Sequence, residues 1–263
     1  IDRVPEPTLD LELAIKVGFD QLALASMIAT RPGRFARDAS RLALEVREAR
    51  TLFESSGWLE KPESYHREPP PLATPALRWR RSLGFSFEHL SFESGYEPHA
   101  GEPGRERWLS HLPNREAHAW VLRHADRPRP WLVCIHGYGM GIPAVDLSAF
   151  EARRLHFELG LNILCPVLPL HGPRKLSLRS GDGFLNGDFL DTVHAEAQAM
   201  WDLRRLLSWL RADGATQIGV YGLSLGGYTT ALLVGLDPGL ACAIAGIPAT
   251  DFSWLVARLA PHA

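Results

Sequence analysis

Between residues 130 and 248 the chain alternates short apolar runs with longer segments whose apolar residues have helical spacing. The first run, PWLVCIHG at 130–137, is almost continuously apolar, which is typical of a strand that is covered on both faces. Strands that alternate with helices in this way build a mostly parallel sheet with helices on both faces. The pattern therefore predicts an α/β fold. Its further strands are LNILCPVLP, TQIGVYG and LACAIAGIP, and its helices lie at 143–159, 190–212 and 224–236.

The sequence pattern before residue 130 differs from that of the predicted α/β region. Helical spacing runs from residue 8 to residue 57, with a break predicted at TRPG. The proline-rich stretch KPESYHREPPPLATP favours neither a helix nor a central strand. The alternating GFSFEHLSFES predicts an antiparallel edge strand, and EAHAWVLRH a second strand. We therefore predict an N-terminal helical extension over 1–60, a linker over 61–78 and the α/β domain over 79–263.

Composition excludes several classes of protein. The chain has 263 residues and a formal net charge of −2, and it carries no basic stripe with interleaved aromatic residues, so a nucleic-acid partner is not expected. The apolar stretch at 9–29 contains four charged residues, which argues against a membrane span. Cys134, Cys165 and Cys242 each lie in an apolar run, which favours buried thiols and a reducing, cytoplasmic location.

One serine stands in a sequence context that suggests chemistry. Gly222-Leu223-Ser224-Leu225-Gly226 follows a predicted strand and opens a predicted helix. A nucleophile elbow requires this context, because its turn is too tight for side chains at the glycine positions and holds the serine hydroxyl exposed. The amide groups of the helix would face the place where negative charge develops.

A second motif lies upstream of the serine. His136-Gly137-Tyr138-Gly139 ends the most apolar strand, and this HGxG stretch is similar to the oxyanion-hole loop of esterases and lipases. Together the two motifs resemble the α/β-hydrolase superfamily over about residues 80 to 255, and GGYTT after the serine is similar to the elbow of acyl-peptidases and related esterases. The resemblance implies that Ser224 is the nucleophile and that the backbone N–H groups of Tyr138 and Leu225 form the oxyanion hole. It implies a small-molecule acyl substrate, an ester more than a peptide, and neither an organic cofactor nor a metal.

The acid and the base of a triad have no motif of their own. The resemblance implies the chain order serine, acid, histidine, and His262 is the one histidine after Ser224. Asp251 would precede it, but a helix predicted over DFSWLVARLA would separate the two by about 16 Å. We therefore expect both groups beyond residue 263, so that the α/β-hydrolase domain is incomplete at its C-terminus. His136 is interpreted as a structural histidine, and His171 as a loop residue without a role, with a place in the lining of the site as the alternative.

The sequence is also compatible with other interpretations. The glycine- and aspartate-rich stretch at 179–191 predicts a lid over the site, and an ordinary surface loop is the alternative. The chain could be a non-catalytic binding or scaffold protein on a hydrolase fold. It could also be an acyltransferase, because hydrolysis and acyl transfer proceed through the same acyl-enzyme. The N-terminal helices could cover the domain or form a homodimer.

Overall fold

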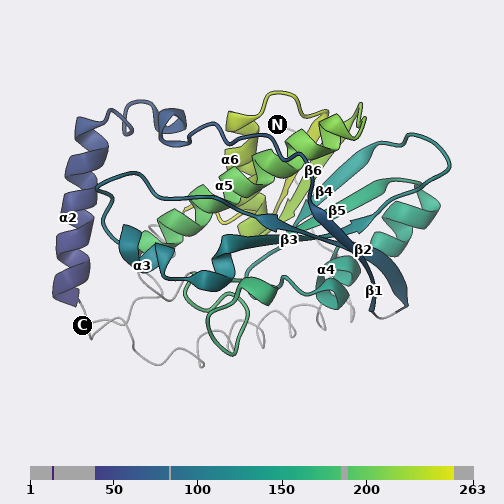
Figure 1. The fold of residues 1–263 in the computed structure, drawn as a ribbon, viewed down its shortest axis with the longest axis horizontal. Coiled ribbons are helices and arrows are strands. Elements are labelled where there is room, and N and C mark those ends of the chain that lie inside the picture. Colours follow the sequence, from purple (N-terminus) through teal and green to yellow (C-terminus); the bar gives the residue numbers. More distant parts are fainter. Residues whose placement is uncertain (1–13, 15–38, 83, 185–188, 252–263) are drawn as a thin grey trace.

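A single mixed sheet organises the described part of the chain. The computed structural model describes residues 14, 39–82, 84–184 and 189–251. In these ranges seven strands are ordered β1-β2-β3-β5-β4-β6-β7 (Figure 1). The strands are β1 Ala76–Ser82, β2 Phe85–Glu93, β3 Glu116–Leu122, β4 Trp131–Ile135, β5 Asn162–Val167, β6 Ile218–Leu223 and β7 Cys242–Gly246.

The second half of the sheet is parallel. β5 pairs with β4, β4 with β6 and β6 with β7, all in parallel, whereas β1, β2, β3 and β5 pair antiparallel in that order. Helices connect the parallel strands, as the alternating pattern predicts. The α-helices are α2 Ala39–Ser55, α3 Arg105–Leu109, α4 Pro143–Ala149, α5 Phe189–Ala212 and α6 Leu225–Leu236.

Helices cover both faces of the sheet. Successive residues of a strand point to opposite faces, and Val133 and Cys134 of β4 accordingly belong to two separate buried clusters. Leu207 of α5 and Leu233 of α6 join the cluster of Val133, and Leu147 of α4 joins that of Cys134. The predicted α/β fold with helices on both faces is therefore confirmed.

The expected edge strand is not at the edge. β2 lies between β1 and β3, and β1, which the sequence analysis did not identify, is the outer strand. β1 reads ALRWRRS and is exposed along most of its length, so it lacks the alternation that marks a half-buried strand. Charged side chains on an edge strand oppose pairing with other chains, which explains a composition so unlike that of its neighbours.

Two further expectations fail locally. The helix expected at 143–159 ends with α4 at Ala149, and a short π-helix follows at Arg154–Glu158. Glu151, with φ of 48°, lies between them, and a right-handed helix cannot continue through such a residue. Cys242 is exposed because β7 is the outer strand of the described sheet, whereas Cys134 and Cys165 are buried as expected.

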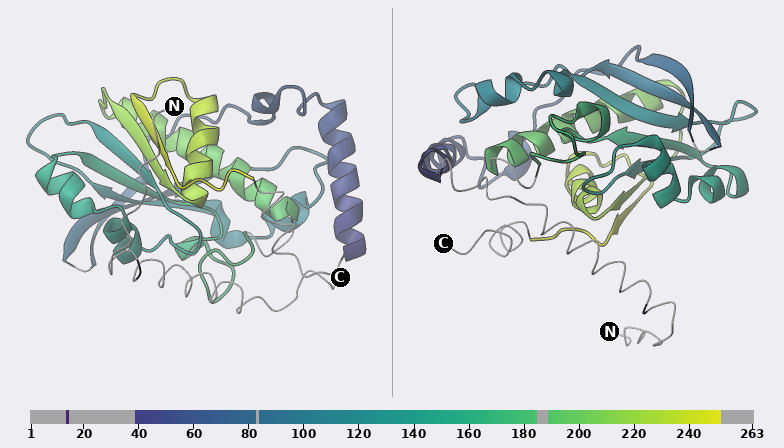
Figure 2. Two further views of the ribbon diagram at one scale, coloured as in Figure 1. Left: turned by 180° about the vertical axis from the view of Figure 1, so that it is seen from behind. Right: turned by 90° about the horizontal axis from the view of Figure 1, so that it is seen from below.

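The N-terminal segments are described in part. α2 and β1 lie at opposite ends of the molecule in Figures 1 and 2. The rest of the helical extension, including the break predicted at TRPG, falls outside the described residues. The range 61–78 contains a 3-10 helix at Pro62–Tyr65 and the start of β1. None of the helices in the described ranges combines the length and apolarity that a membrane crossing needs.

Candidate active site

Ser224 lies at the sharp turn between β6 and α6. Its backbone has φ of 55° and ψ of −110°, a combination that is costly for a residue with a side chain and that recurs at functional sites. The turn is held by hydrogen bonds from the Ser224 N–H to the Gly246 oxygen, 2.9 Å, and from the Tyr228 N–H to the Ser224 oxygen, 3.1 Å. Ser224 is the N-cap residue of α6, but its hydroxyl does not cap the helix. The hydroxyl is therefore not committed to the helix terminus.

Two glycines make this turn sterically possible. A Cβ atom on Gly222 would overlap the backbone of Gly226, and a Cβ on Gly226 would overlap the carbonyl of Ile135. Both separations would be far shorter than any contact a real Cβ atom makes. The strand, the turn and the neighbouring strand are thus packed too closely for any residue but glycine at these two positions. This is the crowding that the sequence motif predicts.

The sheet brings the HGYG stretch next to the serine. β4 and β6 are parallel neighbours with Ile135 opposite Gly222, so the segments that follow them leave the same edge of the sheet. A Cβ atom on Gly137 would lie 3.6 Å from the Cβ atom of Ser224. Leu225, the next residue, is buried at the start of α6. The two predicted motifs therefore meet in space, although 85 positions separate Gly139 from Ser224 in the numbering.

A buried carboxylate fixes the loop at 137–141. Asp146 of α4 is fully buried, and its two oxygens accept hydrogen bonds of 2.9 Å from the Gly141 N–H and from Nε1 of Trp120. Removing the carboxylate would leave two buried donors without an acceptor, which is costly. Asp146 is thus a positioning residue for the loop. Asp146 was not identified from the sequence, where its being the one acidic residue of α4 was the available signal.

His136 has both ring nitrogens engaged within the loop region. Its Nδ1 lies 2.8 Å from the Gly137 oxygen, and its Nε2 accepts the Leu168 N–H at 3.0 Å. These partners place the proton on Nδ1. Burial lowers the pKa of the imidazole, so the ring stays neutral. The environment is that of a structural histidine.

His171 packs beside the same loop with one nitrogen unused. Its Nδ1 lies 2.9 Å from the Pro169 oxygen, while the buried Nε2 has no hydrogen-bond partner among the described residues. A Cβ atom on Gly181 would lie 2.8 Å from this Nε2 and 3.0 Å from the Gly139 nitrogen. Burial, with the neighbouring His136, holds the pKa of the ring well below its ordinary value. His171 therefore presents a neutral hydrogen-bond acceptor close to the loop.

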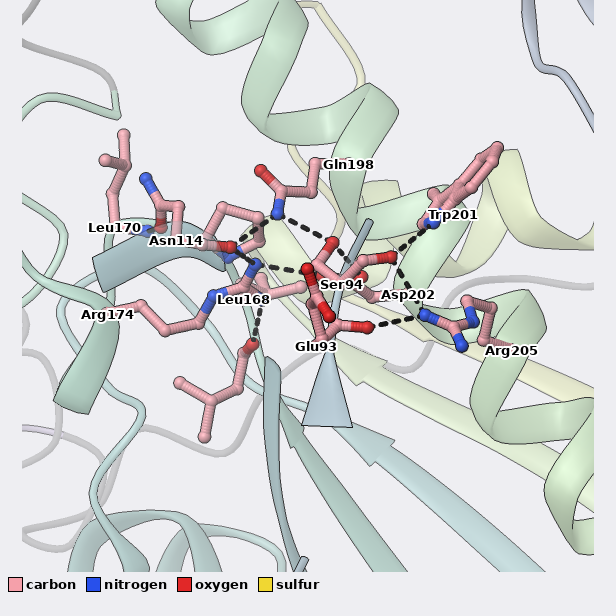
Figure 3. A network of polar contacts seen from close by, with 12 residues as sticks. Glu93, Ser94, Asn114, Leu168, Leu170, Arg174, Gln198, Trp201, Asp202 and Arg205 are labelled. Atoms are coloured by element: carbon pink, nitrogen blue, oxygen red, sulfur yellow. Dashed lines mark hydrogen bonds and ion pairs between the residues drawn. The ribbon is translucent and has the colours of Figure 1, made fainter. Parts of the chain in front are cut away.

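A buried polar network anchors the segment that carries His171 (Figure 3). The Arg174 guanidinium donates to Asp202 of α5 at 2.9 Å and to the main-chain oxygens of Val167 and Asn114, each at 3.0 Å. Ser94, at the end of β2, donates to the second oxygen of Asp202 at 2.6 Å. Partnered buried charges of this kind rigidify their surroundings, because breaking one pair leaves the other charge uncompensated. The end of β5 is thereby tied to α5 and to the end of β2.

A cavity in the described part of the chain lies beside the loop. Its volume is about 1010 Å³, and Tyr138, Gly139 and Gly141 form one wall. Ser224 is not among its described lining residues. The remaining described lining comes from β1, β2, β3, the start of α4 and the segment at 172–182: Arg80, Arg81, Ser82, Phe87, His89, Trp120, Ile142, Pro143, Gly172, Pro173, Lys175, Leu178, Arg179, Ser180 and Asp182.

Relatives of this chain include longer proteins. No family model matches the sequence. An uncharacterised protein of Mycobacterium tuberculosis (strain CDC 1551 / Oshkosh) is 46% identical over 258 residues, which make up 98% of this chain and 62% of that protein. A protein of strain ATCC 25618 / H37Rv is 45% identical over 258 residues, which again make up 98% of this chain and 62% of that protein. The chain therefore spans about three fifths of the length of these relatives.

Two solved structures were compared with the arrangement of the elements. A candidate acetyl xylan esterase from Bacteroides fragilis covers 92% of this chain and 62% of its own, with a TM-score of 0.50 and 16% identity. Acetyl xylan esterase 1 from Thermoanaerobacterium sp. covers 76% of this chain and 66% of its own, with a TM-score of 0.47 and 15% identity. The similarity to the Bacteroides fragilis structure extends over nearly the whole chain. Because the sequence identity is only 16%, this similarity shows a shared fold and nothing more.

Proposed function

Since this chain has the α/β-hydrolase fold, we propose that it is a serine hydrolase that cleaves an ester, thioester or amide bond through an acyl-enzyme on Ser224. The observation that carries the proposal is the strained backbone of Ser224 at the junction of β6 and α6. A positive φ at a non-glycine residue persists where the surrounding structure enforces it. The overlap that any side chain at Gly222 or Gly226 would cause shows how strongly the turn is enforced.

The proposed reaction uses the neighbouring loop to hold negative charge. Oγ of Ser224 attacks the acyl carbonyl, and the carbonyl oxygen becomes an oxyanion that accepts hydrogen bonds from the backbone N–H groups of Leu225 and Tyr138. One such donor typically lowers the barrier by about 3 kcal/mol. Collapse of the tetrahedral intermediate expels the leaving group, and water then releases the acyl group from the serine. Asp146 supports this role indirectly, because it fixes the loop that contains Tyr138.

The proposed base and its orienting acid lie outside the described residues. A base must reach the serine hydroxyl within hydrogen-bond distance or through one water molecule. His136 has both nitrogens engaged by Gly137 and Leu168, and His171 directs its Nδ1 to Pro169. No hydrogen bond joins either ring to Ser224 within the described ranges. These two histidines therefore hold the loop region, and another histidine serves as the base.

An ester is the favoured substrate. The Bacteroides fragilis structure that supports the fold is a candidate acetyl xylan esterase, and this supports an esterase more than a peptidase. The reaction requires neither a metal nor an organic cofactor, since the serine and the backbone donors supply its chemistry. Cys134 and Cys165 are buried free thiols, which supports a reducing, cytoplasmic location. Acyl transfer remains the alternative if an alcohol or amine replaces water.

Replacing the nucleophile tests the proposal. In the full-length protein we expect Ser224→Ala to reduce the hydrolysis of p-nitrophenyl esters at least about a thousandfold, because no acyl-enzyme can form. Melting should change little, since a half-buried hydroxyl without a capping role contributes little stability. Ser148→Ala is the matched control, because Ser148 is exposed in α4 and bonds to its own helix. A Ser224→Ala protein that keeps most of the rate of the control would contradict the proposal.

A further inference from the structure

The cavity beside the loop is surrounded by positive charge. Arg80 and Arg81 reach it from β1, and Lys175 and Arg179 from the segment at 172–182. Asp182 is the one carboxylate in its described lining, and an oxygen of that group accepts the Ser177 hydroxyl at 2.6 Å. The described lining therefore carries four cationic groups against one anionic group.

These four cations are not neutralised by the described chain. None of them forms an ion pair with an acidic side chain in the described ranges, and Lys175 donates instead to the main-chain oxygen of Leu178 at 3.0 Å. Two arginines elsewhere in the described chain are ion-paired, by contrast: Arg129 contacts Asp126 at 2.7 Å and Arg211 contacts Asp237 at 2.6 Å. A concave site with one sign of charge concentrates ligands of the opposite sign.

Part of the cavity lining is aromatic and apolar. Phe87 and Trp120 are buried core residues that reach the cavity wall, and Tyr138 and Ile142 continue the surface towards the loop. His89 also lines the cavity, and burial lowers the pKa of its ring, so it adds no charge near neutral pH. A lining that combines buried aromatic residues with exposed cationic groups fits a ligand with an apolar body and an anionic group.

The position of the cavity connects it to the proposed reaction. Tyr138 and Gly139 line it, and Gly137, the residue before them, approaches Ser224. The loop at 137–141 thus contacts the cavity with one part and the serine turn with another. A substrate whose reacting carbonyl lies at this loop can extend into the cavity.

We infer that the cavity binds part of the substrate, and that this part carries a carboxylate or another anionic group on an apolar or aromatic body. The inference rests on the proposed function and adds a substrate class to it: anionic esters in preference to neutral ones. The cationic groups would act on binding, because the serine and the oxyanion donors perform the chemistry. The preference should weaken at high salt, since exposed charges are screened.

The charge preference can be measured by binding alone. Calorimetry on the full-length protein would compare phenylbutyrate with phenylbutyramide, which has the same shape and no charge. We expect the anion to bind at least about tenfold more tightly, as several exposed cations acting together can produce. Equal affinities for the two probes would overturn the inference.

Variants locate the preference in the cavity. Arg80→Gln combined with Lys175→Gln should reduce the preference to about threefold or less and leave phenylbutyramide binding unchanged. The control combines Arg47→Gln with Arg127→Gln, which removes two exposed arginines outside the lining. Both double variants change the net charge equally. A preference that survives the cavity variant, or that the control also loses, would contradict a site in this cavity.

Covalent labelling of Ser224 separates this inference from the proposed function. Phenylbutyrate should slow the reaction of Ser224 with a fluorophosphonate, because both occupy the substrate site. Charge-selective binding that leaves the labelling rate unchanged would place the anion apart from the serine and overturn the substrate assignment. Normal labelling without any charge preference would contradict the cavity inference alone. Charge-selective binding to a protein whose Ser224 is never labelled would contradict the proposed function alone.

Discussion

Gly222 and Gly226 determine the conformation of the residue between them. The sequence motif identifies this turn because glycine is the residue type that such crowding requires, and the structure gives the physical reason in the overlaps with Gly226 and Ile135. The strain at Ser224 is thus maintained by its neighbours and by its backbone hydrogen bonds rather than by a cap formed by its hydroxyl. The stability of the turn should therefore depend on the glycines more than on the serine.

Gly226→Val tests this dependence. The added side chain would overlap the Ile135 carbonyl, and we expect unfolding in urea to show a loss of about 3 kcal/mol. Gly235→Ala in the same helix is the matched control, because a Cβ atom there meets nothing within 4 Å. The control should be neutral or about 0.5 kcal/mol more stable, since alanine favours a helix. Equal stability of the valine variant and the control would show that the turn is not sterically constrained.

Other residues at the site could not be identified from the sequence. Asp146 matters because its two oxygens meet the Gly141 N–H and Trp120, and these partners come from separate segments of the chain. The surroundings of the unused Nε2 of His171 likewise depend on how the segments that contain Gly139 and Gly181 pack together. Short motifs record local turn geometry, whereas these contacts depend on the tertiary fold.

At the scale of elements, α5 and α6 enclose a carboxyl group that lies outside the proposed chemistry. Glu196 of α5 is buried, and each of its oxygens lies 3.2 Å from the Thr229 hydroxyl of α6. Burial raises its pKa from 4.5 to about 8, and the Thr229 hydrogen bond opposes this only in part. The folded protein therefore holds Glu196 protonated at pH values where the unfolded chain has ionised it.

This raised pKa predicts how stability varies with pH. The protonated form is preferred in the folded state, so the contribution is fully present below about pH 4.5 and is lost as the pH rises towards 8. We expect the wild type to lose up to about 1.4 kcal/mol per pH unit in this window relative to Glu196→Gln. Glu48→Gln, at an exposed position of α2, is the control and should follow the wild type. Parallel stability profiles of the wild type and Glu196→Gln would contradict the raised pKa.

Whether a strand or helix could be predicted from the sequence depended on what it packs against. β4 and β5 are buried along their whole length, and their apolar runs predicted them with nearly correct bounds. β1 escaped prediction because it is an exposed, arginine-rich edge strand whose pairing with β2 is a tertiary feature. The end of α4 was missed because the left-handed conformation of Glu151 has no glycine to signal it.

At the scale of the whole molecule, strand order places the two motifs side by side. β4 and β6 are neighbours in the sheet although β5 and α5 separate them in the sequence, and this crossover brings Gly137 to Ser224. The resemblance to α/β-hydrolases predicted that the motifs would cooperate, but the cavity and its four cations could not be foreseen. They depend on β1, which the sequence analysis placed partly in a linker, meeting the segment at 172–182.

The central claim is that Ser224 is an activated nucleophile, and covalent labelling tests it most directly. The full-length protein would be treated with a fluorophosphonate and its peptides analysed by mass spectrometry, with Ser224→Ala and Ser148→Ala treated alongside. We predict one phosphonylated residue, Ser224, in the wild type and in Ser148→Ala, and none in Ser224→Ala. A non-catalytic scaffold on the same fold would not be labelled. A folded wild-type protein that remains unlabelled at Ser224, or one labelled equally after Ser224→Ala, would contradict the assignment of Ser224 as the nucleophile.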